Sequence, residues 1–441
     1  MEIDVPVVNL PRVVIIGGGF AGVRLAKQLR GKFQVVLIDK NNYHTFQPLL
    51  YQVATAGIEP DSIAFPLRKM FKEYEHFHFR MATAEDVIPG ENILRTSIGE
   101  IKYDYLVIAT GSDTNYFGME KLQQNSMPMK SVSEALDLRS CILQNFEKAL
   151  TVRDLKERVR LMTFVIAGGG PTGVELAGAL GELKKHVLPQ DYPELDFRRM
   201  QIHLIEGAER VLATMDEESS EASCKFLKEL EVHVWTKTRV TGYDGKTVTT
   251  DKEEKFETAT LIWAAGVKGN KLPGLDPQAV RKDGRIVVDE FCRVKNSENI
   301  FAIGDVACMI TESTPNGHPM VAQVAIQMGA RLSSNLRQME KKRTMQPFRY
   351  KDKGSMATIG RNRAVAEVGK WKSQGWFAWL MWLAVHLISL VGFRNRVVVF
   401  FTWFVNYLKY DYGIRLIIRP FIPKPQQLHK EEQKQEHGVH Q

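Results

Sequence analysis

Two stretches of sequence decide the fold: VVIIGGGFAGVRLAKQL, residues 13–29, and FVIAGGGPTGVELAGAL, residues 164–180. They align without a gap, and in each a β-branched run enters three glycines and leaves as a helix rich in Ala and Leu. This pattern predicts a strand, a tight turn and a helix whose N-terminus receives a pyrophosphate. One such motif is weak evidence. Two motifs about a domain apart indicate that one chain binds two dinucleotides, and such a chain is expected to pass electrons between them.

Each glycine of the two motifs has an expected role. The first glycine suits the tight turn, the third lets the backbone approach a phosphate, and the last lets the helix pack on the strand. These residues are Gly17, Gly19 and Gly22 in the first motif and Gly168, Gly170 and Gly173 in the second.

An acidic residue follows the second strand of each motif. Asp39 follows FQVVLI (33–38), and Glu206 follows MQIHLI (200–205) after an expected extra loop, KHVLPQDYPELDFRR (185–199). A carboxylate at this position accepts hydrogen bonds from an adenosine ribose. Because Glu206 would pair with a 2′-hydroxyl and repel a 2′-phosphate, we predict a preference for NADH over NADPH.

The order of strands predicts that one dinucleotide domain is inserted into the other. YDYLVIATGS (103–112) and ENIFAIGDVA (298–307) are expected strands of the first domain, and the second motif lies between them. We therefore predict an α/β fold with two Rossmann-like domains. The predicted boundaries are 1–115 and 286–345 for the first domain, 116–285 for the second, 346–424 for a C-terminal membrane-association region and 425–441 for a disordered tail.

Bulk properties exclude several classes of protein. The 441 residues suffice for two or three domains, and MEIDVPVVNLPR at the start resembles neither a signal nor a transit peptide. The four cysteines show no CxxC spacing, which argues against a disulfide framework, a zinc site or a dithiol motif and favours a reducing compartment. No metal-ligand pattern is present, and we predict no metal.

The C-terminal region is apolar, aromatic and basic. WFAWLMWLAVHLISLVGF (376–393) would form a helix of about 27 Å, marginal against a hydrocarbon core of about 30 Å, and VVVFFTWFVNYL (397–408) is shorter. Residues 370–424 contain eight Lys and Arg residues but one acidic residue, and five of the seven tryptophans lie between 371 and 403. We predict attachment in the plane of a membrane with anionic lipid rather than nucleic-acid binding. A buried helix pair, a dimer interface and a single transmembrane helix stay open as alternatives.

Seven quoted motifs together resemble a known family. They are GGGFAG (17–22), NYHTFQPLLYQVATAGIEP (42–60), ATGSDTNYFG (109–118), GGGPTGVELAG (168–178), WAAGV (263–267), IFAIGDVA (300–307) and AQVAIQ (322–327). The chain resembles the type II NADH dehydrogenases, the single-subunit NADH:quinone oxidoreductases of respiratory membranes that pump no protons. AQVAIQ is the most specific piece, because all flavoproteins with two dinucleotide sites share the glycine motifs.

The resemblance implies non-covalent FAD in the first domain, NADH in the second and a quinone as acceptor. The residues implied for FAD are Gly17, Gly18, Gly19, Phe20, Ala21, Gly22, Asp39, Lys40, Ala84, Thr110, Gly111, Gly304, Asp305, Ala322 and Gln323. Those for NADH are Gly168, Gly170, Pro171, Thr172, Gly173, Glu206, Ala265 and Gly266. The resemblance also implies a homodimer, and we predict a peripheral protein on the cytoplasmic face of the cell inner membrane. The quinone could be menaquinone or ubiquinone.

Glu175 is the predicted catalytic residue. It takes the repeat position of Arg24, seven residues past the first glycine, and the family's corresponding glutamate is implicated in catalysis. We place it on the first turn of its helix, where it would position the nicotinamide and tune flavin reduction. The alternative is an acid stabilised there by the helix dipole.

Gln323 and Gln327 are the predicted quinone contacts, together with Phe46. The two glutamines lie four residues apart and would share one helix face, from which an amide can donate to a quinone carbonyl. Surface glutamines and a core phenylalanine are the alternatives. We also expect His386 to be a packed core histidine.

Other flavoprotein classes are less compatible with the sequence. A dithiol reductase needs a cysteine pair in the first FAD helix region, but the first cysteine is Cys141. A sulfide:quinone oxidoreductase needs cysteines beside the flavin, where only Cys308 follows a flavin motif. A soluble ferredoxin or rubredoxin reductase would lack the Trp-rich segment. An NADH-sensing membrane protein without turnover stays open, and NADH oxidation with a quinone analogue would separate it.

Overall fold

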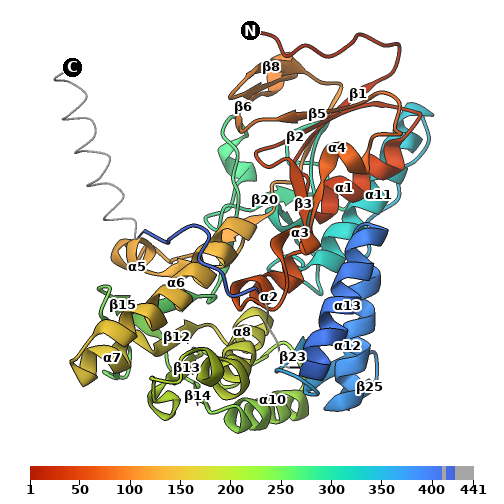
Figure 1. The fold of residues 1–441 in the computed structure, drawn as a ribbon. Helices are drawn as coiled ribbons and strands as arrows, with labels where there is room; N and C mark the ends of the chain where they lie inside the picture. The colour runs from red at the N-terminus through yellow and green to blue at the C-terminus, as the bar shows by residue number, and fades with distance from the viewer. Residues whose placement is uncertain (410–413, 423–441) are drawn as a thin grey trace, which may run out of the picture. The chain divides into compact units, whose positions relative to one another are not determined.

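The computed structural model describes residues 1–409 and 414–422 (Figure 1). The chain forms two compact units, each built from three segments. Unit 1 comprises Met1–Thr45, Ala64–Asp113 and Val267–Lys353. Unit 2 comprises Phe46–Ile63, Thr114–Gly266 and the chain from Gly354 onward.

Unit 1 is built on a five-stranded parallel sheet with the order β5-β2-β1-β9-β21. This is the strand order of a Rossmann fold, in which ligands bind beyond the carboxyl ends of the strands. The strands are β1 (Arg12–Ile16), β2 (Gln34–Asp39), β5 (Phe77–Met81), β9 (Tyr105–Ile108) and β21 (Ile300–Ala302). The β-branched and apolar side chains of β1, β2, β9 and β21 are almost completely buried, as expected for a parallel sheet covered on both faces, whereas the edge strand β5 is only partly buried.

Two helices pack together in unit 1, α1 (Phe20–Leu29) and α11 (Ala322–Glu340). They approach closely because Gly329 has no side chain: a Cβ there would lie 2.6 Å from the Ala21 carbonyl oxygen. The remaining elements are β3 (Tyr43–Thr45), β4 (Ala64–Pro66), α4 (Leu67–Met70), β6 (Ala84–Ile88), η2 (Pro89–Glu91), β7 (Ile93–Thr96), β8 (Gly99–Lys102), β19 (Val267–Gly269), η5 (Pro277–Ala279), β20 (Ile286–Val288), η6 (Gly304–Val306) and β22 (Ala307–Met309), with β10 (Ser112–Thr114) at the boundary with unit 2.

Unit 2 repeats the parallel sheet of unit 1 with the order β14-β13-β12-β18-β11. The strands are β11 (Met127–Pro128), β12 (Thr163–Ala167), β13 (Gln201–Ile205), β14 (Val232–Trp235) and β18 (Thr260–Trp263). The first helix after β12 is α8 (Pro171–Glu182), the counterpart of α1. The elements around them are η1 (Gln47–Leu49), α2 (Leu50–Ala54), α3 (Pro60–Ile63), α5 (Glu120–Asn125), α6 (Val132–Thr151), α7 (Leu155–Leu161), a π-helical turn η3 (Leu183–Val187), α9 (Leu188–Asp191), η4 (Phe197–Arg199), α10 (Glu217–Glu229), β15 (Val240–Tyr243), β16 (Thr247–Thr250) and β17 (Lys255–Glu257).

The C-terminal part of unit 2 contains a small sheet that we did not predict. Strands β23 (Ser355–Thr358), β24 (Ala364–Val368) and β25 (Trp371–Gln374) pair antiparallel. Helices α12 (Trp376–Ser389) and α13 (Phe393–Lys409) follow and lie side by side (Figure 1). In residues 1–409 and 414–422, no helix combines the length and the apolarity needed to cross a bilayer.

The structure differs from the sequence prediction in where segments belong. We assigned 46–63 to the first domain and 267–285 to the second, whereas they lie in unit 2 and unit 1 respectively. The C-terminal segment is part of unit 2 rather than a separate region. The segment 185–199 is not simply a loop, because it continues α8 as a π-helical turn and then forms α9 and η4. The predicted disordered tail lies outside the described residues.

Candidate functional site

The first glycine motif forms a tight turn between β1 and α1 in unit 1. The Gly17 N–H donates to the Ile38 carbonyl (2.8 Å), and Gly17 has a φ of 108°, which side chains disfavour. A Cβ on Gly22 would lie 1.9 Å from the Gly17 carbonyl oxygen, so only glycine fits. In contrast, a Cβ on Gly19 would meet no atom within 4 Å. The turn is therefore tightly packed at Gly17 and Gly22, whereas the space beside Gly19 at the α1 N-terminus is open, as a bound pyrophosphate requires.

Asp39 holds this turn from the end of β2. Its Oδ2 accepts the Gly18 N–H (2.6 Å), and its Oδ1 accepts the Asn41 N–H (2.7 Å). Burial raises the pKa of Asp39, while these two hydrogen bonds lower it. A carboxylate has about four acceptor positions, so both oxygens keep capacity for a ribose hydroxyl.

The loops that follow β9 and β21 carry further predicted FAD residues. Thr110 and Asn270 bind each other: the Thr110 Oγ1–H donates to the Asn270 carbonyl (2.9 Å), and the Asn270 Nδ2–H donates to the Thr110 carbonyl (3.0 Å). The Ser112 hydroxyl donates to Asp305 Oδ2 (2.6 Å). Since β1, β9 and β21 are adjacent parallel strands, these loops and the glycine turn lie at the same edge of the sheet.

Gly304 brings the Asp305 loop against both helices of unit 1. Its φ is 76°, and a Cβ there would lie 3.2 Å from Ala21 and 3.4 Å from Ala325. The remaining predicted FAD residues lie on neighbouring elements. Phe20 begins α1, Gly111 follows Thr110, exposed Lys40 follows Asp39, Ala84 begins β6, and Ala322 and Gln323 begin α11.

The second glycine motif in unit 2 repeats the first almost atom for atom. The Gly168 N–H donates to the Ile205 carbonyl (2.8 Å), and Gly168 also has a φ of 108°. A Cβ on Gly173 would lie 1.9 Å from the Gly168 carbonyl oxygen, while one on Gly170 would meet nothing within 4 Å. Pro171 and Thr172 then begin α8. Proline at this position needs no N–H and has the φ of a helix.

Glu206 braces the second turn as Asp39 braces the first. Its Oε2 accepts the Gly169 N–H, and its Oε1 accepts the Ala208 N–H (2.6 Å). Ala265 lies at the adjacent strand end, because a Cβ on Gly168 would come within 2.8 Å of its Cα. Gly266 follows Ala265 in the loop after β18, and its carbonyl accepts the N–H of Asn115 (3.0 Å).

Glu175 is buried, with 7% of its surface exposed, and lies in the second turn of α8. Our prediction that it lies in the first turn was wrong, since α8 begins at Pro171. Burial raises its pKa to about 8, and hydrogen bonding to the Thr358 N–H (3.5 Å from Oε1) and to the Trp382 side chain lowers it. A pKa of about 8 favours the protonated carboxyl at neutral pH, and Glu175 lies beyond the first turn, where the helix dipole would stabilise an acid.

Three aromatic side chains of unit 2 lie beside one another near Glu175. The Trp382 and His386 rings stack with centroids 4.0 Å apart, and the Phe46 ring meets His386 edge-on at 6.0 Å. Burial lowers the pKa of His386 to about 4, and its Nδ1 binds the Trp382 carbonyl (2.8 Å). Within 1–409 and 414–422, the buried Trp382 Nε1–H has no hydrogen-bond partner of regular geometry, although it lies close enough to affect the Glu175 pKa.

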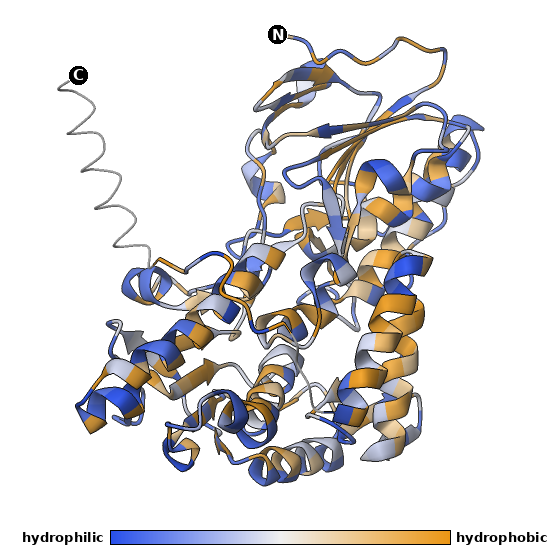
Figure 2. Cartoon of the chain, viewed as in Figure 1, coloured by the Kyte–Doolittle hydropathy of each residue, from blue (hydrophilic) through white to orange (hydrophobic). Residues whose placement is uncertain are grey.

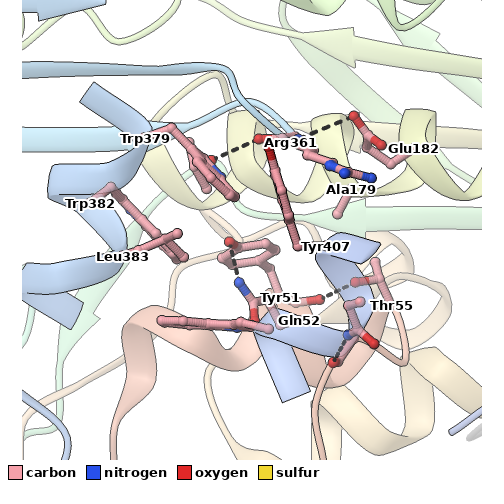
Figure 3. Close-up of a pocket in the computed structure, with 15 residues that line it drawn as sticks. Tyr51, Gln52, Thr55, Ala179, Glu182, Arg361, Trp379, Trp382, Leu383 and Tyr407 are labelled. Carbon is pink, nitrogen blue, oxygen red and sulfur yellow. Dashed lines mark hydrogen bonds between the residues drawn. The ribbon is translucent and has the colours of Figure 1, made fainter. Parts of the chain in front are cut away.

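A pocket of about 100 Å³ lies between α2, α8, β23, α12 and α13 in unit 2 (Figure 3). Its walls include five aromatic side chains, Tyr51, Trp379, Trp382, Trp403 and Tyr407. Hydrogen bonds order its polar side: Gln52 Nε2–H donates to the Tyr51 hydroxyl (2.9 Å), and the Trp403 indole donates to Gln52 Oε1 (2.8 Å). Flat aromatic walls with a few fixed amides suit a flat, partly polar ring.

The predicted quinone residues do not lie together in one unit. Phe46 belongs to unit 2, whereas Gln323 and Gln327 belong to unit 1. Both glutamines bind backbone: Gln323 Oε1 accepts the Lys353 N–H (3.0 Å), and Gln327 binds both the N–H and the carbonyl of Lys351.

Sequence reasoning missed three residues that shape these sites. His44 donates its Nδ1–H to the Gly18 carbonyl (2.9 Å), and burial lowers its pKa, so a neutral ring supports the first glycine turn. Asn270 fixes Thr110, as described above. Trp382 contacts Glu175 and the pocket. His44 was in a quoted motif, but only tertiary contacts across long sequence separations reveal the other two.

The cysteines show no arrangement for dithiol chemistry. All four are free thiols, and Cys141, Cys292 and Cys308 are buried. Burial raises the pKa of Cys141 to about 11 and raises that of Cys292 further. A buried protonated thiol is a poor nucleophile, so neither residue resembles a redox cysteine.

Comparison with known proteins matches this architecture. A family model described as Pyridine nucleotide-disulphide oxidoreductase matches residues 11–329, and one described as NDH2 C-terminal domain matches residues 353–409. Type II NADH:quinone oxidoreductase NdhA of Mycobacterium tuberculosis is 36% identical over 90% of this chain and 87% of its own length. A second protein of that organism, Ndh, is 34% identical with 90% and 88% coverage.

Two solved structures share the fold. NDH2 from Plasmodium falciparum in complex with NADH has a TM-score of 0.84 at 22% identity and covers 93% of this chain and 100% of that one. The sulfide:quinone oxidoreductase of Aquifex aeolicus has a TM-score of 0.70 at 19% identity, and the match covers 88% of this chain and 92% of that one. The sequence matches confirm the resemblance drawn from the motifs. The chain belongs to the type II NADH:quinone oxidoreductases, within the pyridine nucleotide-disulphide oxidoreductase family.

Proposed function

We propose that this chain oxidises NADH with a membrane quinone through one non-covalently bound FAD and pumps no protons. The observation that carries the proposal is the pair of glycine turns, each open in front of a helix N-terminus and each braced by an acid from the next strand. Two such turns in one chain provide one place for a resident dinucleotide and one for a dinucleotide substrate. Family membership implies that these dinucleotides are FAD and NADH.

The turn of unit 1 fits FAD. The backbone of Gly17–Gly22 and the α1 dipole would hold the pyrophosphate, and Asp39 would accept a ribose hydroxyl. Asp305, oriented by Ser112, would hold the ribitol or pyrophosphate from the adjacent strand end. Bound FAD supplies a carrier that accepts a hydride and gives up electrons in a later step.

The turn of unit 2 would bind NADH in the same way. The α8 N-terminus would receive the pyrophosphate, and Glu206 would accept the adenosine 2′-hydroxyl. A 2′-phosphate would face this carboxylate, so NADPH should bind more weakly. Ala265 and Gly266 would line the nicotinamide half at the end of β18.

Glu175 would act as a neutral acid next to the nicotinamide site. Because its pKa is about 8, it keeps its proton at neutral pH and presents no charge to a nicotinamide that becomes positive on oxidation. Its Oε1 is held by the Thr358 N–H, which fixes the carboxyl group. The residue would therefore position the nicotinamide rather than attack it.

Support for a quinone site in unit 2 comes from Phe46, Trp382 and the aromatic pocket. A quinone ring could stack against these side chains, and the Trp382 Nε1–H could donate to a quinone carbonyl. This position uses one of the three predicted quinone residues. The other two, Gln323 and Gln327, are considered below.

Helices α12 and α13 support attachment to a membrane surface. Figure 2 shows that many residues of these two helices are hydrophobic, and Ile388, Phe393, Phe401 and Leu408 are each more than half exposed. Arg394 lies among these residues with 69% of its side chain exposed. Exposed apolar and basic side chains on adjacent helices fit the interface of an anionic bilayer. The homodimer, which the resemblance implies, and the location on the cytoplasmic face of the inner membrane stay predictions.

Steady-state kinetics test the proposed function. The purified protein, loaded with FAD, should oxidise NADH when a soluble ubiquinone or menaquinone analogue is added, and the two analogues together would identify the preferred headgroup. Vesicles containing anionic lipid should bind the protein more tightly than neutral vesicles. A protein that binds NADH but turns over neither quinone would be a sensor, and turnover of sulfide instead would place it with the sulfide:quinone oxidoreductases.

A further inference from the structure

Helix α11 binds the backbone of the segment that follows it through the amides of its own side chains. At one end, the buried Asn335 donates from Nδ2 to the Gln346 carbonyl (2.9 Å) and accepts the Gln346 N–H at Oδ1 (2.9 Å). One side-chain amide thus binds both polar groups of one backbone residue. This is the pattern that a neighbouring β-strand would otherwise supply.

Gln327 repeats the same pair of hydrogen bonds two turns nearer the helix start. Its Nε2–H donates to the Lys351 carbonyl (2.9 Å), and its Oε1 accepts the Lys351 N–H (3.0 Å). Gln323, one turn nearer still, accepts the Lys353 N–H (3.0 Å). We call Gln323, Gln327 and Asn335 with these partners the amide ladder.

The order of the partners in the ladder shows a chain that runs antiparallel to the helix. Gln327 and Asn335 are eight residues apart, about 12 Å along a helix. Their partners Gln346 and Lys351 are five residues apart and could span about 17 Å if fully extended, so this stretch is long enough to connect the two contacts. Residues 343–354 form neither helix nor strand, so side-chain amides supply much of the hydrogen bonding of this segment.

The ladder ends where the chain leaves unit 1. Lys353 is the last residue of unit 1, and Gly354 begins the C-terminal segment of unit 2. Five residues beyond Lys353, Thr358 donates its N–H to Glu175 and lines the aromatic pocket. The ladder therefore lies immediately before β23 in the chain.

We infer that Gln327 is a positioning residue: the amide ladder sets the path of residues 346–353 and, through the chain, the start of β23. The structural part of this inference is independent of the proposed function. The effect on turnover rests on that function. Gln327 thus acts through the backbone that it holds.

Limited trypsin digestion and hydrogen exchange test the structural part. Arg349, Lys351 and Lys353 are exposed cleavage sites within the segment. Gln327→Met keeps the side-chain length but removes both hydrogen bonds, so cleavage at these sites and exchange of the 346–353 amides should rise roughly tenfold. Gln327→Glu keeps the acceptor for the Lys351 N–H, so its rates of cleavage and exchange should lie between those of the wild type and Gln327→Met. Gln338→Met is the matched control, because this partly buried amide on the same helix makes no side-chain hydrogen bond within the described residues.

Kinetics with NADH and a quinone analogue test the positioning role. Gln327→Met should lower kcat for the quinone severalfold with little change in KM, and Gln327→Glu should restore part of the rate. Asn335→Leu should show the same split, although Asn335 lies about 18 Å along the helix from Gln323. If Asn335→Leu does not fold, the comparison of Gln327→Met with Gln327→Glu still tests the positioning role.

The outcomes separate the inference from the proposed function. Unchanged cleavage and exchange in Gln327→Met overturn the ladder. A raised quinone KM in Gln327→Met, with kcat and protection intact, makes Gln327 a quinone contact and also overturns it. Loss of protection in a protein that never turns over quinone supports the ladder and rejects the proposed function instead.

Discussion

The two glycine turns share one backbone geometry but differ at the fifth residue of the helix that follows. Gly17 and Gly168 have the same φ, and both turns are braced by an acid from the next strand. In the first helix the fifth residue is an exposed arginine, Arg24, whereas in the second it is the buried Glu175. The common parts are those that any dinucleotide needs.

The difference marks what is specific to the substrate side. Helix α1 packs against α11, another helix of unit 1, whereas α8 packs against β23 and ends beside a π-helical turn. An acid at the fifth position of α8 is therefore buried against the C-terminal segment, and its pKa rises. The repeat provides two turns of the same geometry, and its departure at Glu175 places a buried acid at the fifth helix position after only one of them.

The largest effects should come from the glycines that both turns share. Gly22→Ala and Gly173→Ala each place a methyl group 1.9 Å from a carbonyl oxygen, so each turn must open. We expect Gly22→Ala to lose its yellow FAD, and Gly173→Ala to keep FAD but lose NADH binding by 100-fold or more, about 3 kcal/mol. Flavin absorbance and NADH titration measure the two results. Gly90→Ala, where the added methyl meets no atom within 4 Å, is the control; equal loss of FAD in both variants would contradict two separate sites.

Removing the acid that distinguishes the second turn should have the next largest effect. Glu175→Ala removes the carboxyl group next to the predicted nicotinamide site, and NADH-driven flavin reduction should fall roughly tenfold or more while FAD stays bound. Wild-type turnover should decline as pH rises through about 8, because Glu175 then becomes charged. Glu175→Gln cannot ionise, so this decline should disappear. Stopped-flow reduction across pH 6–9 checks both points, and an unaltered profile in Glu175→Gln would remove Glu175 from the mechanism.

The two bracing acids should affect different ligands. Glu206→Gln removes the charge facing a 2′-phosphate, so the ratio of kcat/KM for NADH over NADPH should fall about tenfold, roughly 1.4 kcal/mol. Asp39→Asn should weaken FAD instead and leave that ratio as it is. Steady-state kinetics with both nucleotides make the comparison, and an unchanged ratio in Glu206→Gln would show that another residue selects NADH.

The last expected effect is a pH dependence of stability, which is spread over several pH units. The folded protein holds a proton on Glu175 that the unfolded chain loses above its ordinary pKa of 4.5, and this proton leaves the folded state near pH 8. The free energy of unfolding should therefore fall as pH rises from about 4.5 to 8, by at most about 5 kcal/mol. Glu175→Gln should flatten this slope, and Glu312→Gln, at an exposed loop position, should not. Thermal unfolding midpoints at pH 6 and pH 8.5 measure the difference.

The sequence predicted the two glycine turns and the strands around them, because these features depend on residues that are close together in the chain. The glycine turns, the strands around them, Asp39 and Glu206 all lie within about forty residues of their motif. The β23–β25 sheet was not predicted, although a glycine at positive φ, Gly360 or Gly369, lies in each of its two connections. Residues 46–63 were assigned to the first domain but lie in unit 2, because α2 packs against α6 and α8, which are distant in the sequence.

The candidate site divides in the same way. The position of Glu175 was visible from the repeat, but its burial depends on Thr358 and Trp382, about 200 residues later. The glutamines of AQVAIQ were predicted to share a helix face and to contact quinone. Their partners are backbone groups of residues 351 and 353, which no spacing within the motif could indicate.

Anaerobic titration of the FAD-loaded protein with NADH tests the central claim most directly, because it needs both sites in one chain. The account predicts that the flavin absorbance bleaches with one equivalent of NADH and returns when a quinone analogue is added. A yellow protein that NADH never bleaches, or one that fails to hold FAD at all, would contradict it.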